Sequence, residues 1–114
     1  MKKSLRDFLE DILKYAKIIQ EKTMNLSSEE FEQNEERVLS VMMALAIIGE
    51  ASKNIPDEFP CLYPQVEWRK MAGMRDKIIH DYSQVRLITL WQTSQDNIPD
   101  LIAKMTTIIN HQED

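Results

Sequence analysis

The sequence predicts an all-α fold, an antiparallel bundle of four main helices with a kinked last helix. Hydrophobic residues recur at helical spacing in each long segment, and no segment alternates polar and apolar residues with the period of a β-strand. The chain has 114 residues but only two glycines and four prolines, so it lacks the composition of a flexible linker. We therefore expect a single helical domain over residues 1–114, long enough to enclose a hydrophobic core.

The first helix is predicted to begin after Ser4 and to end between Thr23 and Asn25. Ser4 precedes Asp7 by three residues, which is the spacing of a capping box at a helix N-terminus. The apolar residues keep the helical period, while charged residues fill the opposite face. The residues expected to face the core are Leu5, Phe8, Leu9, Ile12, Ala16 and Ile19.

A second helix is predicted to begin at Ser28. Ser27 and Glu30 also have capping-box spacing, and Asn34 can restart the helix after a short first piece. The first turns are rich in glutamate, which suits the positive end of a helix, and we interpret these acids as a solvated face instead of a metal site. They are Glu29, Glu30, Glu32, Glu35 and Glu36.

The stretch from Val38 to Ile48 is apolar except for Ser40, and the longest apolar run, Val41 to Ile48, is too short to span a membrane. Its helix should continue to about Lys53 and end before Pro56. A helix that is apolar on two sides is buried on two sides, so this is either the central helix or a helix with one face in the core and another in a subunit interface. One stripe is Val38, Val41, Met42, Leu45 and Ile48, and the other is Leu39, Met43 and Ile47.

Residues 54–66 form the one long connection, because three of the four prolines lie within it. It contains Cys61, the only cysteine, which excludes an internal disulfide and suits a reducing cytoplasm. We interpret Cys61 as a small, semi-buried residue and not as a nucleophile. Because Cys and His are few, no metal-ligand spacing is present, and we predict neither a metal site nor a cofactor.

A helix over about residues 66–80 carries an apolar stripe that includes a charged residue. Arginine is rarely tolerated at such a position without a partner, and Arg75 lies on this stripe. Asp76 and His80 are four residues apart, so the carboxylate can orient the imidazole. The simpler alternative is a core helix whose Arg75 extends to solvent and whose His80 suits the negative helix end. The stripe is Trp68, Met71, Ala72, Arg75, Ile79 and Tyr82.

The last helix is predicted from Leu87 to Ile109, with a kink at Pro99. Both glycines, Gly49 and Gly73, fall inside predicted helices, which indicates close backbone approach at a helix crossing. Residues 110–114 are expected to fray. The core-facing residues of the last helix should be Leu87, Trp91, Ile98, Leu101, Ile102, Met105 and Ile108.

Charge is distributed unevenly along the chain. The net charge of −5 argues against non-specific binding to nucleic acid, yet residues 69–86 contain five cations and only two acids. This basic segment coincides with the stretch that contains Arg75, His80 and Tyr82. A phosphate-bearing partner could bind there, although a mixed solvated surface explains the same pattern.

The same stretch resembles a known signature. Arg75, four spacers, His80, one spacer and Tyr82 are similar to the motif of the HEPN superfamily. The flanking segments 48–56 and 68–76 resemble its HepT-like branch of small ribonuclease toxins, which are encoded beside a minimal nucleotidyltransferase antitoxin. The resemblance is clearest over residues 48–101.

The resemblance implies a metal-independent endoribonuclease with RNA as substrate. The single cysteine and the short apolar runs lead us to expect a cytoplasmic protein without membrane association. It implies that His80 acts as acid or base, that Arg75 holds the phosphate, and that two such motifs meet across a homodimer. Asp76 would support His80. Tyr82 matches a tyrosine that the antitoxin can modify with adenosine monophosphate. Two other functions remain open: a non-catalytic helical binding partner of a nucleotidyltransferase, and a plain dimeric scaffold.

Overall fold

The computed structural model describes residues 3–112, and within that range it is helical with no strand, which confirms the all-α prediction. Two short segments are not α-helices: η1 is a 3-10 turn and η2 is π-helical. The elements are α1 (Leu5–Thr23), α2 (Ser28–Glu32), α3 (Glu35–Lys53), α4 (Glu58–Leu62), α5 (Trp68–Asp81), η1 (Tyr82–Gln84), α6 (Leu87–Gln92), η2 (Thr93–Asn97) and α7 (Ile98–Asn110).

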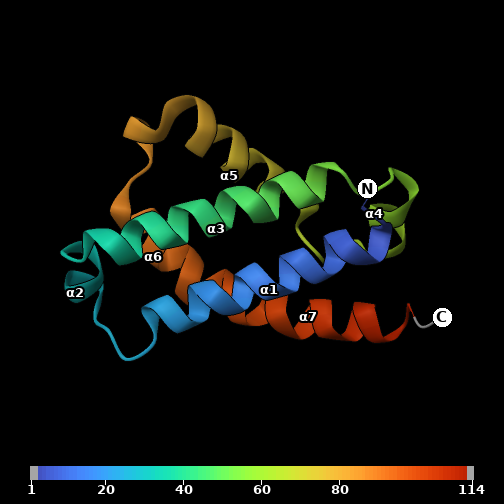
Figure 1. The fold of residues 1–114 in the computed structure, drawn as a ribbon, viewed down its shortest axis with the longest axis horizontal. Helices are drawn as coiled ribbons and strands as arrows, with labels where there is room; N and C mark the ends of the chain where they lie inside the picture. The colour runs from blue at the N-terminus through green and yellow to red at the C-terminus, as the bar shows by residue number, and fades with distance from the viewer. Residues whose placement is uncertain (1–2, 113–114) are drawn as a thin grey trace.

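The four long helices pack as neighbours in the order α5, α3, α1 and α7 (Figure 1). Adjacent members of this series run in opposite directions, so the bundle is antiparallel as predicted. The short helix α6 continues through η2 into α7 and lies behind α3 in this view. Among the described residues, no helix is long and apolar enough to cross a membrane.

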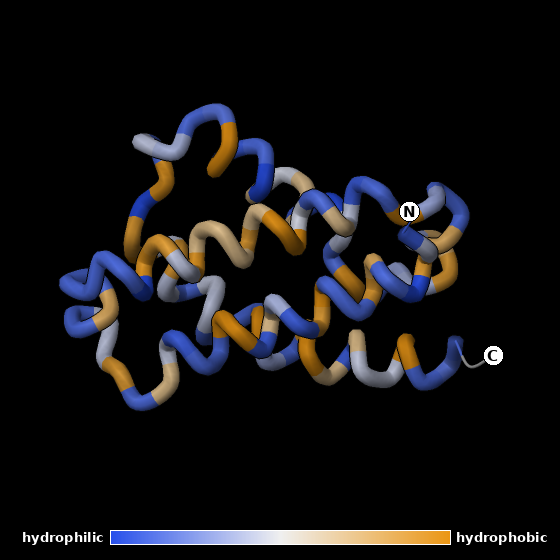
Figure 2. The backbone as a smooth tube through the Cα atoms, in the orientation of Figure 1, coloured by the Kyte–Doolittle hydropathy of each residue, from blue (hydrophilic) through white to orange (hydrophobic). Residues whose placement is uncertain are grey.

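The core lies between α1, α3 and α7. Figure 2 shows hydrophobic residues recurring along α1 and α7 and through the middle of α3. Burial of large apolar side chains is the main force that holds such a bundle together. The largest fully buried side chains are Phe31, Leu9, Ile12, Ile19, Ile48, Leu90, Ile98, Met105, Ile108 and Val41.

Both predicted capping boxes are present. The hydroxyl of Ser4 accepts a hydrogen bond from the backbone of Asp7, and Ser27 does the same for Glu30. Asn34 caps α3 by accepting from the backbone of Arg37 at 3.1 Å, so the second helix restarts where the sequence predicted. Each cap satisfies an N–H group that the helix itself leaves unpaired.

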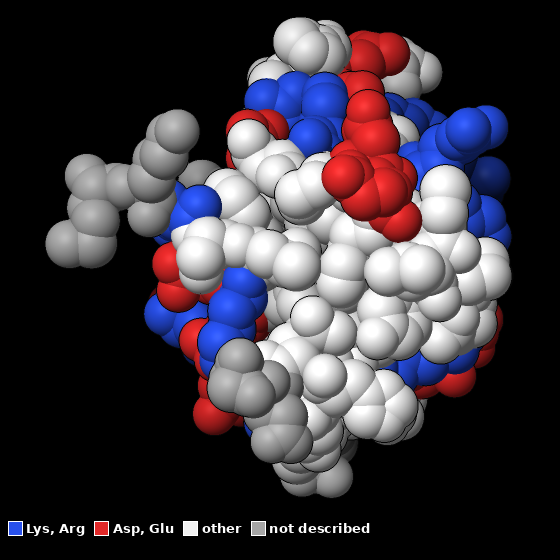
Figure 3. All heavy atoms as spheres, turned by 90° about the vertical axis from the view of Figure 1, so that its right-hand side faces the viewer, with Lys and Arg blue, Asp and Glu red and all other residues white. Residues whose placement is uncertain are grey.

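The long connection contains a helix that the prolines concealed. Within residues 54–66, α4 places Pro60 as its third residue, where the missing N–H removes no helical hydrogen bond. Phe59 is buried, and its ring packs edge-on against the ring of Trp68 with 6.0 Å between the ring centroids. This packing anchors α4 to the start of α5. Figure 3 views this end of the molecule and shows uncharged side chains across its centre.

The predicted interruption of the last helix is the π-helical segment η2, located just before Pro99. In a continuous α-helix the proline ring would clash with a carbonyl one turn earlier, and a wider turn relieves that clash. The Ser94 hydroxyl donates to the Trp91 carbonyl at 2.6 Å within this region. Leu87 is 37% exposed, so its predicted place in the core is wrong.

The crossing of α3 and α5 depends on one of the two glycines. A Cβ built on Gly49 would lie 2.2 Å from the Cβ of Arg75 and 2.5 Å from the carbonyl oxygen of Met71. Close backbone approach is therefore confirmed for Gly49. It is wrong for Gly73, whose Cβ would meet nothing within 4 Å, because that face of α5 borders an open groove.

Part of the segment predicted to fray, residues 110–114, makes tertiary contacts within the described range. Asn110 is helical, and the Gln112 side chain donates to the Tyr63 hydroxyl at 3.2 Å. The backbone carbonyl of Gln112 accepts from Arg6 at 3.3 Å, so side chains from two other segments hold this end. Residues 113–114 lie outside the described range, as do residues 1–2.

Candidate functional site

Arg75 is held at the α3–α5 crossing by acidic neighbours. Its side chain lies over Gly49 and is only 24% exposed. The Arg75 Nε atom is 3.2 Å from the Glu50 carboxylate of α3, and its Nη1 atom is 3.1 Å from Asp76. The expectation that a charged residue on the apolar stripe needs a partner is confirmed, and the two carboxylates fix the position of the guanidinium.

Asp76 joins the same cluster. Its carboxylate accepts a hydrogen bond from Lys53 of α3 at 2.8 Å and another from Arg75 at 3.1 Å. These two cations, Lys53 first, lower the pKa of the Asp76 carboxyl below its usual value. No hydrogen bond within residues 3–112 joins Asp76 to His80, so the structure pairs this carboxylate with two cations instead of with the imidazole.

The lowered pKa makes Asp76 a source of acid sensitivity. A folded-state pKa below the unfolded one contributes stability that is full above the unfolded pKa and is lost as pH falls through the folded pKa. We therefore expect Asp76→Asn to reduce the free energy of unfolding at about pH 7, and by less at about pH 2, where more of the Asp76 carboxyl is protonated. Urea titrations at both pH values measure this difference.

Asp81→Asn is the matched control, because Asp81 sits on the same helix and forms no ion pair with residues 3–112. It should leave the free energy of unfolding unchanged at both pH values. A difference between parent and Asp76→Asn that is as large in acid as at neutral pH would show that the effect does not come from the charge of Asp76.

His80 and Tyr82 lie at the exposed end of α5. His80 is in the last turn, and Tyr82 begins η1 with 70% of its surface exposed. The predicted stripe is wrong at this end of the helix, because Ile79 is half exposed and its neighbour Ile78 is buried instead. The surface beyond Arg75 is therefore open to a partner, and His80 and Tyr82 are reachable from solvent.

Comparison with known proteins places the chain in a family. The sequence model described as "Ribonuclease HepT-like" matches residues 12–108, which include the whole of α5. The chain belongs to this family. The predicted HepT-like membership is confirmed, and no solved structure matches the chain.

Three relatives illustrate how closely this HepT-like chain matches the family. It is 46% identical over 104 residues to "Probable ribonuclease HepT" of Thermococcus cleftensis, covering 91% of this chain and 94% of that protein. It is 38% identical over 112 residues to "Putative RNase MJ1216" of Methanocaldococcus jannaschii, covering 98% and 93%. It is 35% identical over 111 residues to "Putative RNase TTE0752" of Caldanaerobacter subterraneus, covering 97% and 99%.

Sequence reasoning missed two members of the Arg75 cluster, Glu50 and Lys53. Both lie on α3, three residues apart, one and four positions after Gly49. The signal that could have found them is the glycine itself, because a glycine that lets a second helix approach also brings the polar residues beside it within reach of that helix. Which helix approaches cannot be read from the spacing.

The next features concern the single cysteine and the possible metal ligands of this HepT-like chain. Cys61 is exposed on α4, so the prediction that it is semi-buried is wrong, and its Sγ lies 4.0 Å from the Asp57 carbonyl oxygen. Over residues 3–112 there is no group of three or more His, Cys, Asp and Glu side chains that could hold a metal ion. The acidic first turns of α2 and α3 are exposed, as predicted.

Proposed function

We propose that the protein is an endoribonuclease toxin that cleaves RNA through Arg75 and His80 without a metal ion. The observation that carries the proposal is the exposed end of α5 in a chain of the ribonuclease HepT-like family: Arg75 is fixed by Glu50 and Asp76, and His80 follows on the same helix. The relatives named as ribonucleases support the same activity.

The proposed reaction is a transesterification within the RNA chain. A base takes the proton of a ribose 2′-hydroxyl, and that oxygen attacks the adjacent phosphorus. The bond to the 5′-oxygen of the next nucleotide breaks, and an acid returns a proton to this leaving oxygen. Histidine suits one of these two transfers because its imidazole exchanges a proton near neutral pH, and His80 is accessible to solvent.

Arg75 would neutralise the phosphate. One additional negative charge develops on the phosphoryl oxygens as the deprotonated 2′-oxygen adds, and a guanidinium can donate two hydrogen bonds to them. Glu50 and Asp76 position the guanidinium, while Lys53 shares the Asp76 carboxylate and adds a cation to the same surface. Asp76 is thus a positioning residue in this proposal, acting through Arg75.

The test is cleavage of single-stranded RNA by the purified full chain in the presence of a metal chelator. Products that end in a 2′,3′-cyclic phosphate are expected, since transesterification leaves that group on the upstream fragment. Cleavage that requires an added divalent ion would contradict the metal-independent mechanism. Absence of cleavage would favour a non-catalytic binding partner of a nucleotidyltransferase.

A homodimer would bring two such sites together. The second apolar stripe of α3 is uncovered in one chain, where Leu39 is 59% exposed and Met43 is 62% exposed. Glu50 lies on the same side of α3, so this uncovered stripe is continuous with the Arg75 cluster. Contiguous exposed apolar residues of this kind mark a protein interface.

We expect the parent chain to sediment as a dimer at micromolar concentration and the double variant Leu39→Glu/Met43→Glu to sediment as a monomer. Two carboxylates buried without partners in a symmetric interface are strongly unfavourable. Leu62→Glu is the control, because Leu62 on α4 is 69% exposed but lies away from the stripe, and it should remain dimeric. A monomeric parent, or a double variant that stays dimeric, would contradict the proposed homodimer interface on α3.

Control by an antitoxin would act at Tyr82. Its side chain is 70% exposed and follows His80 by two residues, so a nucleotidyltransferase can reach the hydroxyl. Adenylylation there would form a bond from the Tyr82 oxygen to the α-phosphorus of ATP, with pyrophosphate leaving. The added phosphate would compete with RNA for Arg75, and the base would obstruct the site.

Co-expression with a minimal nucleotidyltransferase should add one adenylate to Tyr82 and abolish RNA cleavage. Intact-mass and peptide mass spectrometry locate the modification, and Tyr82→Phe should remain unmodified and active. Tyr15, which is half-buried on α1, is the control position and should stay unmodified. An inhibited complex whose Tyr82 carries no adenylate would point to steric inhibition instead.

A further inference from the structure

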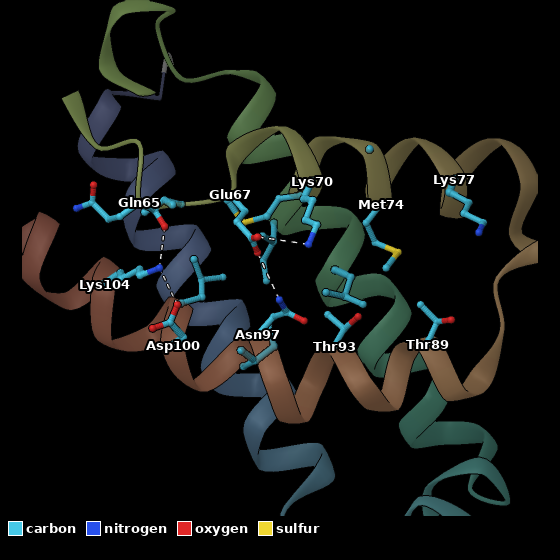
Figure 4. A pocket seen from close by; sticks show the side chains of 17 residues that line it. Gln65, Glu67, Lys70, Met74, Lys77, Thr89, Thr93, Asn97, Asp100 and Lys104 are labelled. Carbon is cyan, nitrogen blue, oxygen red and sulfur yellow. Dashed lines mark hydrogen bonds and ion pairs between the residues drawn. The ribbon is translucent and has the colours of Figure 1, made fainter. Parts of the chain in front are cut away.

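The bundle has an open seam between α5 and the run α6–η2–α7. A groove of about 390 Å³ lies there, with Leu45 and Ile48 of α3 at its base. Figure 4 shows α5 along one side and α6–α7 along the other, with α3 behind them. Met71 and Met74 contribute flexible apolar walls from α5, and Ile98 and Leu101 contribute walls from α7. A concave, mostly apolar space of this size is typical of a small-molecule site.

This groove is separate from the Arg75 cluster. Its lining residues on α5 include Lys70, Gly73, Met74 and Lys77, which share one face of the helix because they are three, four and seven residues apart. Arg75 and Asp76 point to α3 on another face. The lack of a side chain at Gly73 keeps the rim of the groove open.

The polar groups at one end of the groove are already paired. Asn97 donates to Glu67 at 3.4 Å, and Glu67 also accepts from Lys70. Lys104 donates to the Gln65 carbonyl at 2.7 Å and pairs with Asp100 at 2.7 Å. These contacts bridge η2 and α7 to residues 65–67, just before α5, and leave two carboxylates at this end, which would repel an anion.

The opposite end has polar groups without partners. Lys77 forms no ion pair with any residue in the range 3–112, and Figure 4 shows it projecting from α5 on the side of Thr89. The hydroxyls of Thr23, Thr106 and Thr107 each donate to a carbonyl of their own helix. The half-buried Thr89 and Thr93 make no such bond within the described range, so their hydroxyls are free for a ligand.

We propose that this groove binds a small apolar monocarboxylate. The apolar body would lie against the partly exposed Met71 and Met74, and the carboxylate would accept hydrogen bonds from Lys77 and from a threonine hydroxyl. A single charge fits because Lys77 is the one lining cation without an acidic partner among the described residues, Lys70 and Lys104 being paired. The acids at the far end fix the orientation, with the carboxylate toward Lys77.

The test is calorimetric titration of the purified full chain with decanoate, at concentrations below those at which decanoate forms micelles. One molecule per chain is expected. Lys77→Met should weaken binding by about tenfold or more, because it removes a charge-assisted contact. Lys17→Met is the matched control, since Lys17 is exposed on α1 outside the groove and forms no ion pair within residues 3–112, and it should bind as the parent does.

Two further measurements sharpen the result. Decyltrimethylammonium, with the same tail and the opposite charge, should not bind. Thr93→Trp should abolish decanoate binding by filling the groove, while circular dichroism and sedimentation stay as in the parent. These readouts do not involve RNA, so they stand or fall independently of ribonuclease activity.

The proposal is overturned if decanoate shows no saturable binding to the parent, or if Lys77→Met and Lys17→Met bind it equally well. It is also overturned if the cationic analogue binds as tightly, since the site would then be apolar without selectivity for an anion. A change in sedimentation mass on Thr93→Trp would assign the groove to a contact between copies of the chain instead.

Discussion

Replacing His80 by alanine should lower the rate of RNA cleavage by about a hundredfold to ten-thousandfold and leave the helical fold unchanged. The loss follows from removing a proton-transfer group from the proposed site. The fold should survive because His80 is exposed in the last turn of α5 and contributes nothing to the core. Initial cleavage rates measure the first effect, and thermal unfolding measures the second.

His111→Ala is the matched control, because His111 is the chain's other histidine and is also exposed just beyond a helix end. It should cleave RNA as the parent does. Arg75→Ala should also be inactive, but with some loss of stability, since the Arg75 side chain packs over Gly49. If His80→Ala cut RNA at the parent rate, the assignment of His80 as acid or base would be wrong.

The second large effect concerns stability. Gly49→Ala should lower the free energy of unfolding by about 1–3 kcal/mol or more, because overpacking forces neighbouring groups to move. The added Cβ would lie 2.5 Å from the Met71 carbonyl oxygen and 2.2 Å from the Arg75 Cβ, so the relief must come from separating two helix backbones. That separation would also displace Arg75 from Glu50. Chemical denaturation measures the loss of stability.

Gly73→Ala provides a control within the same helix pair. Nothing lies within 4 Å of the position its Cβ would occupy, and both glycines have helical backbone conformations. Alanine is about 0.5–1 kcal/mol more favourable than glycine in a helix, so Gly73→Ala should be neutral or stabilising. Equal destabilisation by the two substitutions would contradict the structural distinction between these two glycines.

Local interactions made much of the fold predictable from sequence. Both capping boxes and the Asn34 cap depend on residues three positions apart, and the structure has all three. The helical period of α1 also led directly to its core residues, since Leu9, Ile12, Ala16 and Ile19 are fully buried. The spacing of Arg75, His80 and Tyr82 predicted the family for the same reason, because all three lie on one segment.

What sequence determined, then, was each of the main helices and the chemistry that it carries along its own length, whereas the short helix α4 was not predicted. The tertiary structure alone decided which positions meet across helices. Gly49 and Gly73 both lie inside predicted helices, yet only Gly49 lies where two helices cross closely. Likewise, Ile78 is buried and Ile79 is half exposed. Helix periodicity specifies a face but not what covers it, because that depends on the crossing of α5 over α3.

The same limit applies to the site and the groove. Glu50 and Lys53 reach the Arg75 cluster from a helix more than twenty positions earlier in the chain. The spacing of residues within one helix does not predict such a contact between helices. The groove exists because α5 packs on α3 while α6–η2–α7 follows its own path, leaving a seam that no single helix contains. Side chains on one helix are fixed relative to each other by its regular geometry, whereas the spaces between helices depend on how complete side-chain surfaces fit together.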